Sequence, residues 1–150
     1  MTEDLPDTED VHPRSQALVL LTGLYLFLLI MTILSYGQPV PLFGQMLEGR
    51  SAQIFIVLDS LVCLYLFLGL WQRQRLTWYL LMIYNGYEVL NTLTNLWLVP
   101  RKELERILER SVDPSGMLLS NLVTVGLILW VTWTIRQQRD QFTNHSPYLF

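Results

Sequence analysis

The strongest constraint in this sequence is an apolar run near its beginning that is long enough to cross a lipid bilayer. Residues 17–36 read ALVLLTGLYLFLLIMTILSY and contain no charged side chain. A helix needs roughly 20 mostly apolar residues to span the hydrocarbon core of a membrane. The residues before this run are acidic, which is the reverse of the basic segment that opens a secretory signal. We therefore expect the run to form a membrane-spanning helix.

Three further segments have the length and composition of membrane spans. The four expected spans cover about residues 16–36, 53–71, 76–99 and 117–135. Gly37 and Pro39 end the first span, because proline cannot continue a helix and glycine favours its exit. The turn-forming sequence DPSG at 113–116 precedes the fourth span. The sequence thus predicts an all-α membrane protein, a four-transmembrane-helix bundle.

The charged residues indicate a single membrane domain covering residues 1–150. Only 15% of the residues are charged, compared with roughly 25% in soluble domains, and nearly all lie between the apolar runs or at the two ends. Residues 1–14 and 140–150 read as flexible tails. The net charge of -3 and the absence of a Lys/Arg-rich run argue against nucleic acid as a partner.

The segment of about residues 100–111 is predicted to form a short amphipathic helix outside the membrane, between spans three and four. Leu104, Ile107 and Leu108 recur at helical spacing, and charged residues fill the positions between them. Two roles remain open for this helix. It either docks a partner or lies on lipid headgroups, or it is a connector whose apolar stripe rests on the bundle.

The orientation follows only weakly from the basic residues. With four spans both termini share one side, and the two sides carry equal numbers of Lys and Arg. Arg73 and Arg75 lie in a very short turn and Arg136 directly follows a span, which favours cytoplasmic termini. We expect a multi-pass protein of the cell membrane, either a plasma membrane or a bacterial inner membrane.

The third span is unusually polar, and its polar residues share one face. At 3.6 residues per turn, the following side chains form a single stripe: Tyr84, Asn85, Glu88, Asn91, Thr92 and Asn95. Unsatisfied polar groups facing lipid cost several kcal/mol, so the stripe must meet the bundle interior, a partner or a water-filled cleft.

Polar residues of the other spans are expected at the same depth as this stripe. Counted from the loop that carries Arg101, Asp59 and Asn91 lie about two turns into the membrane. Asn121 and Thr124 of the fourth span lie about one and two turns in, and Thr32 of the first span lies at a similar level. We therefore expect polar groups from all four spans to gather in one half of the membrane.

Two interpretations of this polar cluster remain open. In the structural one, the amides and hydroxyls form interhelical hydrogen bonds, each contributing about 0.6–2 kcal/mol. In the functional one, Glu88 matters most, because a carboxyl group within a span is costly and no span offers it a Lys or Arg partner. A carboxyl that can gain and lose a proton suits ion or proton coupling, or binding of a cationic ligand. Asp59, nearer the surface, fits the structural interpretation slightly better.

Most other chemistries are not supported by the sequence. Cys63 is the only cysteine, so no internal disulfide or CxxC pair can form, and His12 and His145 both lie in the tails. We expect no cofactor, no metal site and no catalytic residues. The leading hypothesis is a non-enzymatic membrane subunit or accessory protein, with the lipid bilayer and other membrane subunits or further copies as partners. The alternative is a small ion- or proton-coupled transporter that uses Glu88 and Asp59.

Overall fold

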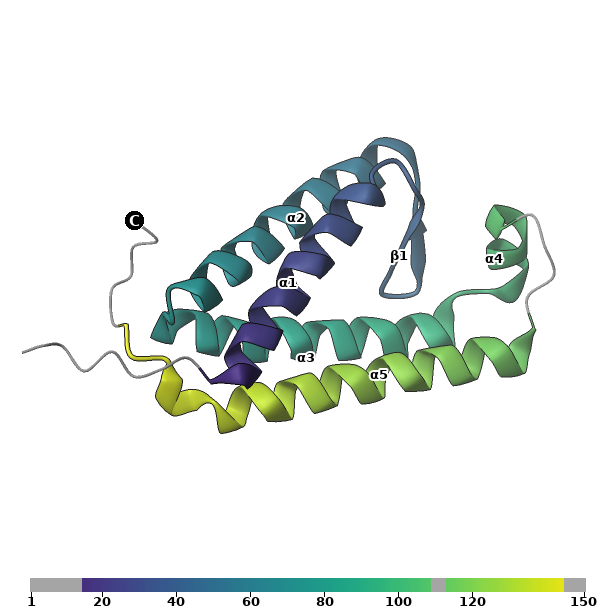
Figure 1. Ribbon diagram of the computed structural model, residues 1–150. Helices are drawn as coiled ribbons and strands as arrows, with labels where there is room; N and C mark the ends of the chain where they lie inside the picture. Colours follow the sequence, from purple (N-terminus) through teal and green to yellow (C-terminus); the bar gives the residue numbers. More distant parts are fainter. Residues whose placement is uncertain (1–14, 109–112, 145–150) are drawn as a thin grey trace, which may run out of the picture.

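The computed structural model describes residues 15–108 and 113–144, and these described residues are mostly helical (80%). Five α-helices, a two-stranded hairpin and a short 3-10 helix occur in the described ranges (Figure 1). In chain order they are α1 (Gln16–Leu34), β1 (Val40–Leu42), β2 (Gln45–Leu47), α2 (Gly49–Trp71), α3 (Arg75–Leu98), α4 (Arg101–Leu108), α5 (Pro114–Gln137) and η1 (Arg139–Gln141).

Three of these helices, α1, α2 and α5, are long and apolar enough to cross a membrane. The helix α3 is as long as α5, at 24 residues, but it is not one of the three. The reason is the polar stripe, which lowers the mean hydropathy of α3 without shortening the helix. Of the four predicted spans, three are therefore supported by length and composition.

The long helices form two pairs that meet at one end and diverge toward the other (Figure 1). The helix α1 packs chiefly on α2, and α3 packs chiefly on α5. The core lies where the two pairs meet and draws on all four long helices and on the segment after α5: Leu18, Leu21, Tyr25, Leu66, Leu70, Leu81, Ile135 and Phe142. The space between the diverging ends is where the hairpin lies.

The hairpin corrects the prediction of an all-α protein. Val40–Leu42 pairs antiparallel with Gln45–Leu47, and Phe43 and Gly44 form the two-residue turn with φ values of 44° and 83°. Positive φ at both central residues is the signature of the type I′ turn that joins short antiparallel strands. Each strand has only three residues, which is too short for an alternating pattern to be recognised in the sequence.

The helix ends differ from the predicted spans by a few residues. The helix α2 begins at Gly49 rather than 53, and α5 extends from Pro114 to Gln137 rather than from 117 to 135. Hydropathy detects only the apolar part of a helix, whereas capped polar turns extend it at both ends. Residues 109–111 of the expected helix 100–111 lie outside the described residues, as do residues 1–14 and 145–150 of the expected tails.

Residues 139–144 differ from the expectation of a loose tail beginning at 140. The backbone of Asn144 pairs with the α2–α3 turn: its N–H donates to the Arg73 carbonyl (3.2 Å) and its carbonyl accepts from the Arg75 N–H (2.9 Å). Phe142 is buried in the core. The end of the described chain is therefore held where the two helix pairs meet.

Candidate functional site

Two consecutive residues of the polar stripe connect α3 to the three other long helices. The Tyr84 hydroxyl donates to Asp59 Oδ1 of α2 (3.0 Å). Asn85 Oδ1 accepts from the Tyr25 hydroxyl of α1 (2.7 Å), and Asn85 Nδ2 donates to Thr132 Oγ1 of α5 (3.0 Å). Successive residues of a helix point about 100° apart, so neighbours can face different partners. The two side chains thus join both helix pairs near their meeting point.

The hydrogen-bonding groups around Asn85 are matched. Thr132 accepts from Asn85 and donates its own proton to the Ile128 carbonyl of α5 (2.7 Å). Tyr25 is almost fully buried and donates its single proton to Asn85. A buried polar group left without a partner would cost about 1–3 kcal/mol, so this matching favours the observed arrangement of α1, α3 and α5.

Cys63 belongs to the polar cluster, although it lies within an apolar run of α2. Its sulfur lies 3.4 Å from the Tyr84 hydroxyl oxygen, and Thr32 of α1 lies beside it. Because Tyr84 has one proton and donates it to Asp59, the Cys63 thiol is the donor to Tyr84. Asp59, Cys63 and Tyr84 therefore form one chain of hydrogen bonds between α2 and α3.

Glu88 lies one helical turn beyond Tyr84 and differs from the other candidate residues. It is partly buried and within electrostatic range of Asp59. Among the described residues, no hydrogen bond or ion pair is formed by its carboxyl group. The segments 51–72, 76–100 and 111–135 contain no Lys or Arg. Two carboxyl groups thus lie near each other, at the centre of α2 and α3, without a cationic side chain from these segments.

Asn91 and Asn95 bind the hairpin turn. Asn91 Oδ1 accepts from the Phe43 N–H (2.9 Å), and Asn95 Oδ1 accepts from the Gly44 N–H (2.7 Å). Asn95 Nδ2 donates both to the Pro41 carbonyl (3.1 Å) and to Asn91 Oδ1 (3.1 Å). The N–H groups at the tip of a two-residue turn have no partner within the hairpin itself. The two asparagines supply that partner and hold the turn against the last part of α3.

Asn121 and Thr124 are not brought into contact with the stripe. The Asn121 amide donates to the Met117 carbonyl (2.9 Å), and the Thr124 hydroxyl donates to the Ser120 carbonyl (3.0 Å). Both bonds remain within α5, and Thr124 is exposed. The polar residue that α5 contributes is Thr132, two turns beyond Thr124. Thr132 was not predicted, because its partner Asn85 lies more than one turn farther from the Arg101 end of α3 than Asn91, whose depth was the one at which polar groups were expected to gather.

Tyr25 is the other participant that the sequence did not identify. It lies in the middle of the most apolar span, whereas aromatic residues with polar groups are usually enriched at the two membrane surfaces. A tyrosine far from both ends of a span needs a hydrogen-bond partner inside the bundle. The position of Tyr25 in the middle of an apolar span is therefore the sequence feature from which its hydrogen bond could have been predicted.

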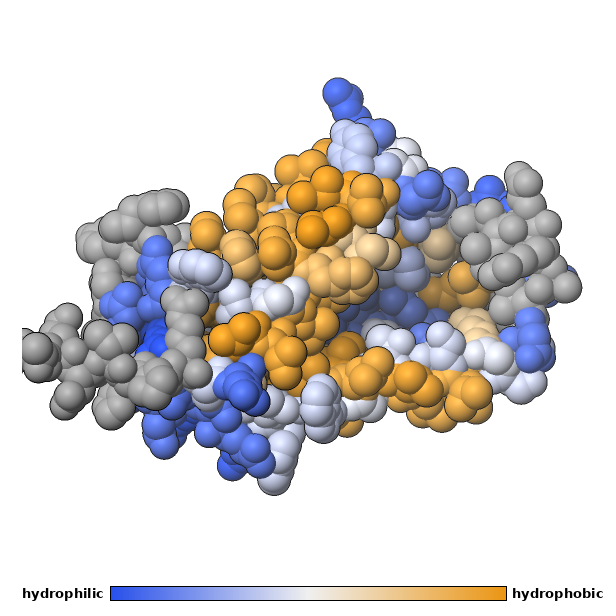
Figure 2. Space-filling view, viewed as in Figure 1, coloured by the Kyte–Doolittle hydropathy of each residue, from blue (hydrophilic) through white to orange (hydrophobic). Residues whose placement is uncertain are grey.

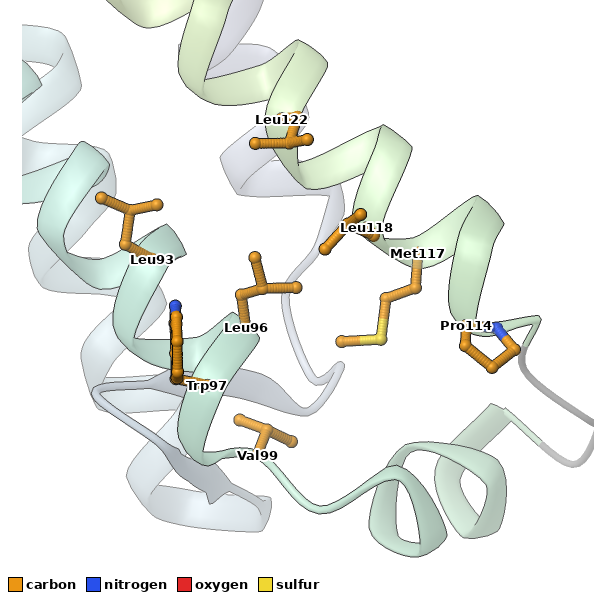
Figure 3. A pocket seen from close by; sticks show the side chains of 8 residues that line it. All are labelled: Leu93, Leu96, Trp97, Val99, Pro114, Met117, Leu118 and Leu122. Atoms are coloured by element: carbon orange, nitrogen blue, oxygen red, sulfur yellow. The ribbon is translucent and has the colours of Figure 1, made fainter.

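The surface has a hydrophilic hollow and two pockets near these residues. Figure 2 shows hydrophilic residues in a hollow between the two helix pairs, flanked by hydrophobic surface. A groove of about 560 Å³ lies between α2 and α3 and includes Asp59 and Tyr84 in its lining. A second pocket, of about 540 Å³, lies between the end of α3 and the start of α5, where Leu96 and Met117 point toward each other (Figure 3). None of the residues that line this second pocket carries a charged or titratable side chain.

Comparison with known proteins gives no guide to this site. No protein-family model, no curated protein and no solved structure matches the chain. The interpretation of the site therefore depends on three observations. Four residues of α3 bind other elements, two carboxyl groups lie near each other, and the groove between α2 and α3 has an acidic residue in its lining.

Proposed function

We propose that the chain is an integral membrane protein with four spans, in which α3 crosses the bilayer between α2 and α5. Three residues, 72–74, join α2 to α3, and α3 packs along α5, so a bilayer crossed by α2 and α5 includes α3 as well. The polar stripe is compatible with this position because its partners are protein groups rather than lipid. In this arrangement α4 lies outside the membrane and both termini are cytoplasmic.

Within that membrane we infer a non-enzymatic role, as a subunit or accessory protein. The observation that carries this inference is the use of the polar stripe: Tyr84, Asn85, Asn91 and Asn95 are each bonded to another element of the same chain. Side chains of a catalytic site need groups that are free to bind substrate. These groups instead assemble the two helix pairs and the hairpin.

The partner in this proposal is another membrane protein or a second copy, and α5 is the helix with most surface left for it. In the most apolar 18-residue stretch of each helix, only 6% of α5 is buried, compared with 22% of α1 and 28% of α2. Gly126 of α5 is exposed, and a side chain added there would meet no atom within 4 Å. A second helix could therefore approach α5 closely along this side.

The accessory role is tested by native mass measurement of the protein purified in a gentle detergent. We expect the protein to appear with a partner chain or as a dimer. Gly126→Trp should weaken that association by adding a large side chain to the open surface of α5. Gly23→Trp is the matched control, because Gly23 of α1 is equally open and lies on another helix. A wild-type protein that is only ever a monomer would contradict the proposal.

One observation favours a second candidate, an ion- or proton-coupled carrier. The Glu88 carboxyl group has no hydrogen bond to a described residue and lies near Asp59, so it remains available for exchange with a proton or cation. In vesicles containing a pH-sensitive dye, a carrier should move protons and Glu88→Gln should abolish that movement. If Glu88→Gln leaves proton movement or its pH dependence unchanged while Glu88→Leu prevents folding, Glu88 is structural and the carrier is excluded.

A further inference from the structure

The groove between α2 and α3 has the size and lining of a small-molecule site. Its volume of about 560 Å³ lies within the range of roughly 300–1,000 Å³ that is usual for ligand pockets. Four of its lining residues are aromatic: Phe55 and Tyr65 from α2, and Tyr84 and Tyr87 from α3. The rest of the lining is aliphatic apart from one acid. The groove is thus an apolar, ring-lined space with a single charged group.

That acid, Asp59, retains the capacity to bind a ligand. Its Oδ1 accepts from Tyr84, whereas its Oδ2 receives no hydrogen bond from the described residues. Asp59 Oδ2 is also not fully buried. The oxygen is therefore unbonded and reachable. Since residues 51–72 and 76–100 contain no Lys or Arg, α2 and α3 contribute no cation of their own along the groove.

Charge and lining together favour a cationic ligand. A carboxylate attracts a positive charge, and the faces of phenylalanine and tyrosine rings attract cations through their quadrupoles. Glu88, within electrostatic range of Asp59, adds a second acidic group nearby. An anionic ligand would instead place its charge next to two carboxyl groups.

The depth of Asp59 further restricts the ligand. Asp59 lies ten residues after the start of α2 at Gly49 and twelve before its end at Trp71, or roughly 15 and 18 Å at 1.5 Å per residue. A phospholipid with a cationic headgroup could bring its nitrogen to this depth only by drawing its phosphate into the hydrocarbon core. The lining also includes Val62 and Ile83, which are 43% and 67% exposed, so access is from the lipid side.

We propose that the α2–α3 groove binds a lipophilic organic cation that carries no phosphate, with its charge at Asp59 and its apolar groups against the aromatic rings. This site is separate from the accessory role proposed above and depends only on α2 and α3 lying within the membrane. A protein that binds no partner could still bind the cation, so the two proposals succeed or fail independently.

The test uses two probes of the same size and shape but opposite charge, tetraphenylphosphonium and tetraphenylborate. Binding to the full chain in phosphatidylcholine nanodiscs is measured by equilibrium dialysis against empty nanodiscs. We expect saturable binding of tetraphenylphosphonium and none of tetraphenylborate. Asp59→Asn keeps an acceptor for Tyr84 but removes the charge, and it should weaken cation binding about tenfold or more. Tyr65→Leu should weaken it about threefold to tenfold through loss of the ring.

Three controls keep the result interpretable. Asp140→Asn removes an exposed negative charge outside the groove and should leave binding unchanged. Asp59→Glu retains the charge and should retain most of the binding. Circular dichroism and thermal unfolding establish that Asp59→Asn folds like the wild type.

Equal binding of both probes, or wild-type affinity in Asp59→Asn, would overturn the proposal. Loss of binding in Glu88→Gln but not in Asp59→Asn would overturn it too, because the cation would then be held at Glu88 rather than at Asp59.

Discussion

At the scale of single residues, Asn85 has the largest structural consequence, because it contacts two helices outside its own. Its amide accepts from Tyr25 and donates to Thr132, and Tyr25 and Asn85 are both buried. Water does not reach a buried group readily enough to replace a lost partner. The relative positions of α1, α3 and α5 therefore depend on one amide group.

Replacing Asn85 by leucine should lower the free energy of unfolding by about 1–2 kcal/mol, because the Tyr25 hydroxyl loses its partner. Tyr25→Phe alone should also be destabilising. In the double variant, Tyr25→Phe should add almost nothing to the effect of Asn85→Leu, since the bond is already lost. Unfolding titrations in mixed detergent micelles measure all four proteins. Fully additive effects would show that the two side chains do not interact.

Gly69 tests the close approach of α2 and α3 next to their connecting turn. A Cβ atom added to Gly69 would lie 2.7 Å from Thr77 Cβ, closer than two carbon atoms can be without displacement. Gly69→Ala should therefore destabilise the protein by about 1–3 kcal/mol. Gly86→Ala on α3 is the control, because a Cβ there meets no atom within 4 Å. If both variants unfold alike, the two helices are farther apart than described.

At the scale of elements, the hairpin is unusual because its position depends on side chains of a helix. The turn N–H groups of Phe43 and Gly44 donate to Asn91 and Asn95, and the Phe43 and Tyr87 rings form a T-shaped pair with 5.6 Å between centroids. The hairpin thus lies over the polar stripe rather than apart from it, and the asparagines determine whether it stays there.

Asn95→Ala removes three hydrogen bonds and should release the hairpin from α3. The expected result is faster amide hydrogen exchange at Phe43 and Gly44, with little change in the exchange of α1 and α2. Thr92→Ala is the matched control, because Thr92 belongs to the same stripe but its hydroxyl forms no hydrogen bond with a described residue. Unchanged exchange in Asn95→Ala would mean that the strands alone fix the hairpin.

The start of α5 depends on Asp113, whose carboxylate accepts from the N–H groups of Gly116 and Ser115. These bonds, together with the Ser115 hydroxyl, hold the pKa of Asp113 below its usual value. A lowered pKa means that the stabilisation is present at neutral pH and is lost as the pH falls through that value, below roughly pH 4. Amide exchange at Ser115 and Gly116 should lose protection in that range, and Asp113→Ala should lose it at every pH.

The lengths and order of the helices follow from the sequence because apolar length and Gly/Pro stops are local properties. Tyr84 was predicted only as part of the polar face of the third span and Asp59 only at the depth of that face, so their hydrogen bond was not itself predicted. Which residue of α5 meets Asn85 depends on how α3 and α5 pack along each other, and the sequence pattern of a single helix does not contain this contact. For the same reason Thr132 was not identified, and Asn121 and Thr124 were expected in a cluster that they do not join.

At the scale of the whole molecule, the membrane arrangement depends on α3. Three helices have the composition of membrane spans, and α3 is as long as the longest of them but has a polar face. If α3 crosses the membrane, its stripe is an internal structural element and the α2–α3 groove faces lipid. If it does not, the loops on either side of it lie on one surface. Neither the proposed carrier nor the proposed cation site then lies within the membrane.

The most direct measurement is therefore the sidedness of the two ends of α3. In a Cys63→Ala background, single cysteines at Gln72, before α3, and at Ser115, after it, are labelled in sealed vesicles with a membrane-impermeant maleimide. A cysteine at Gln45 marks the side of the hairpin. The four-span account predicts that the cysteines at 45 and 115 label from one side and the cysteine at 72 only from the other. Labelling of 72 and 115 from the same side would contradict it.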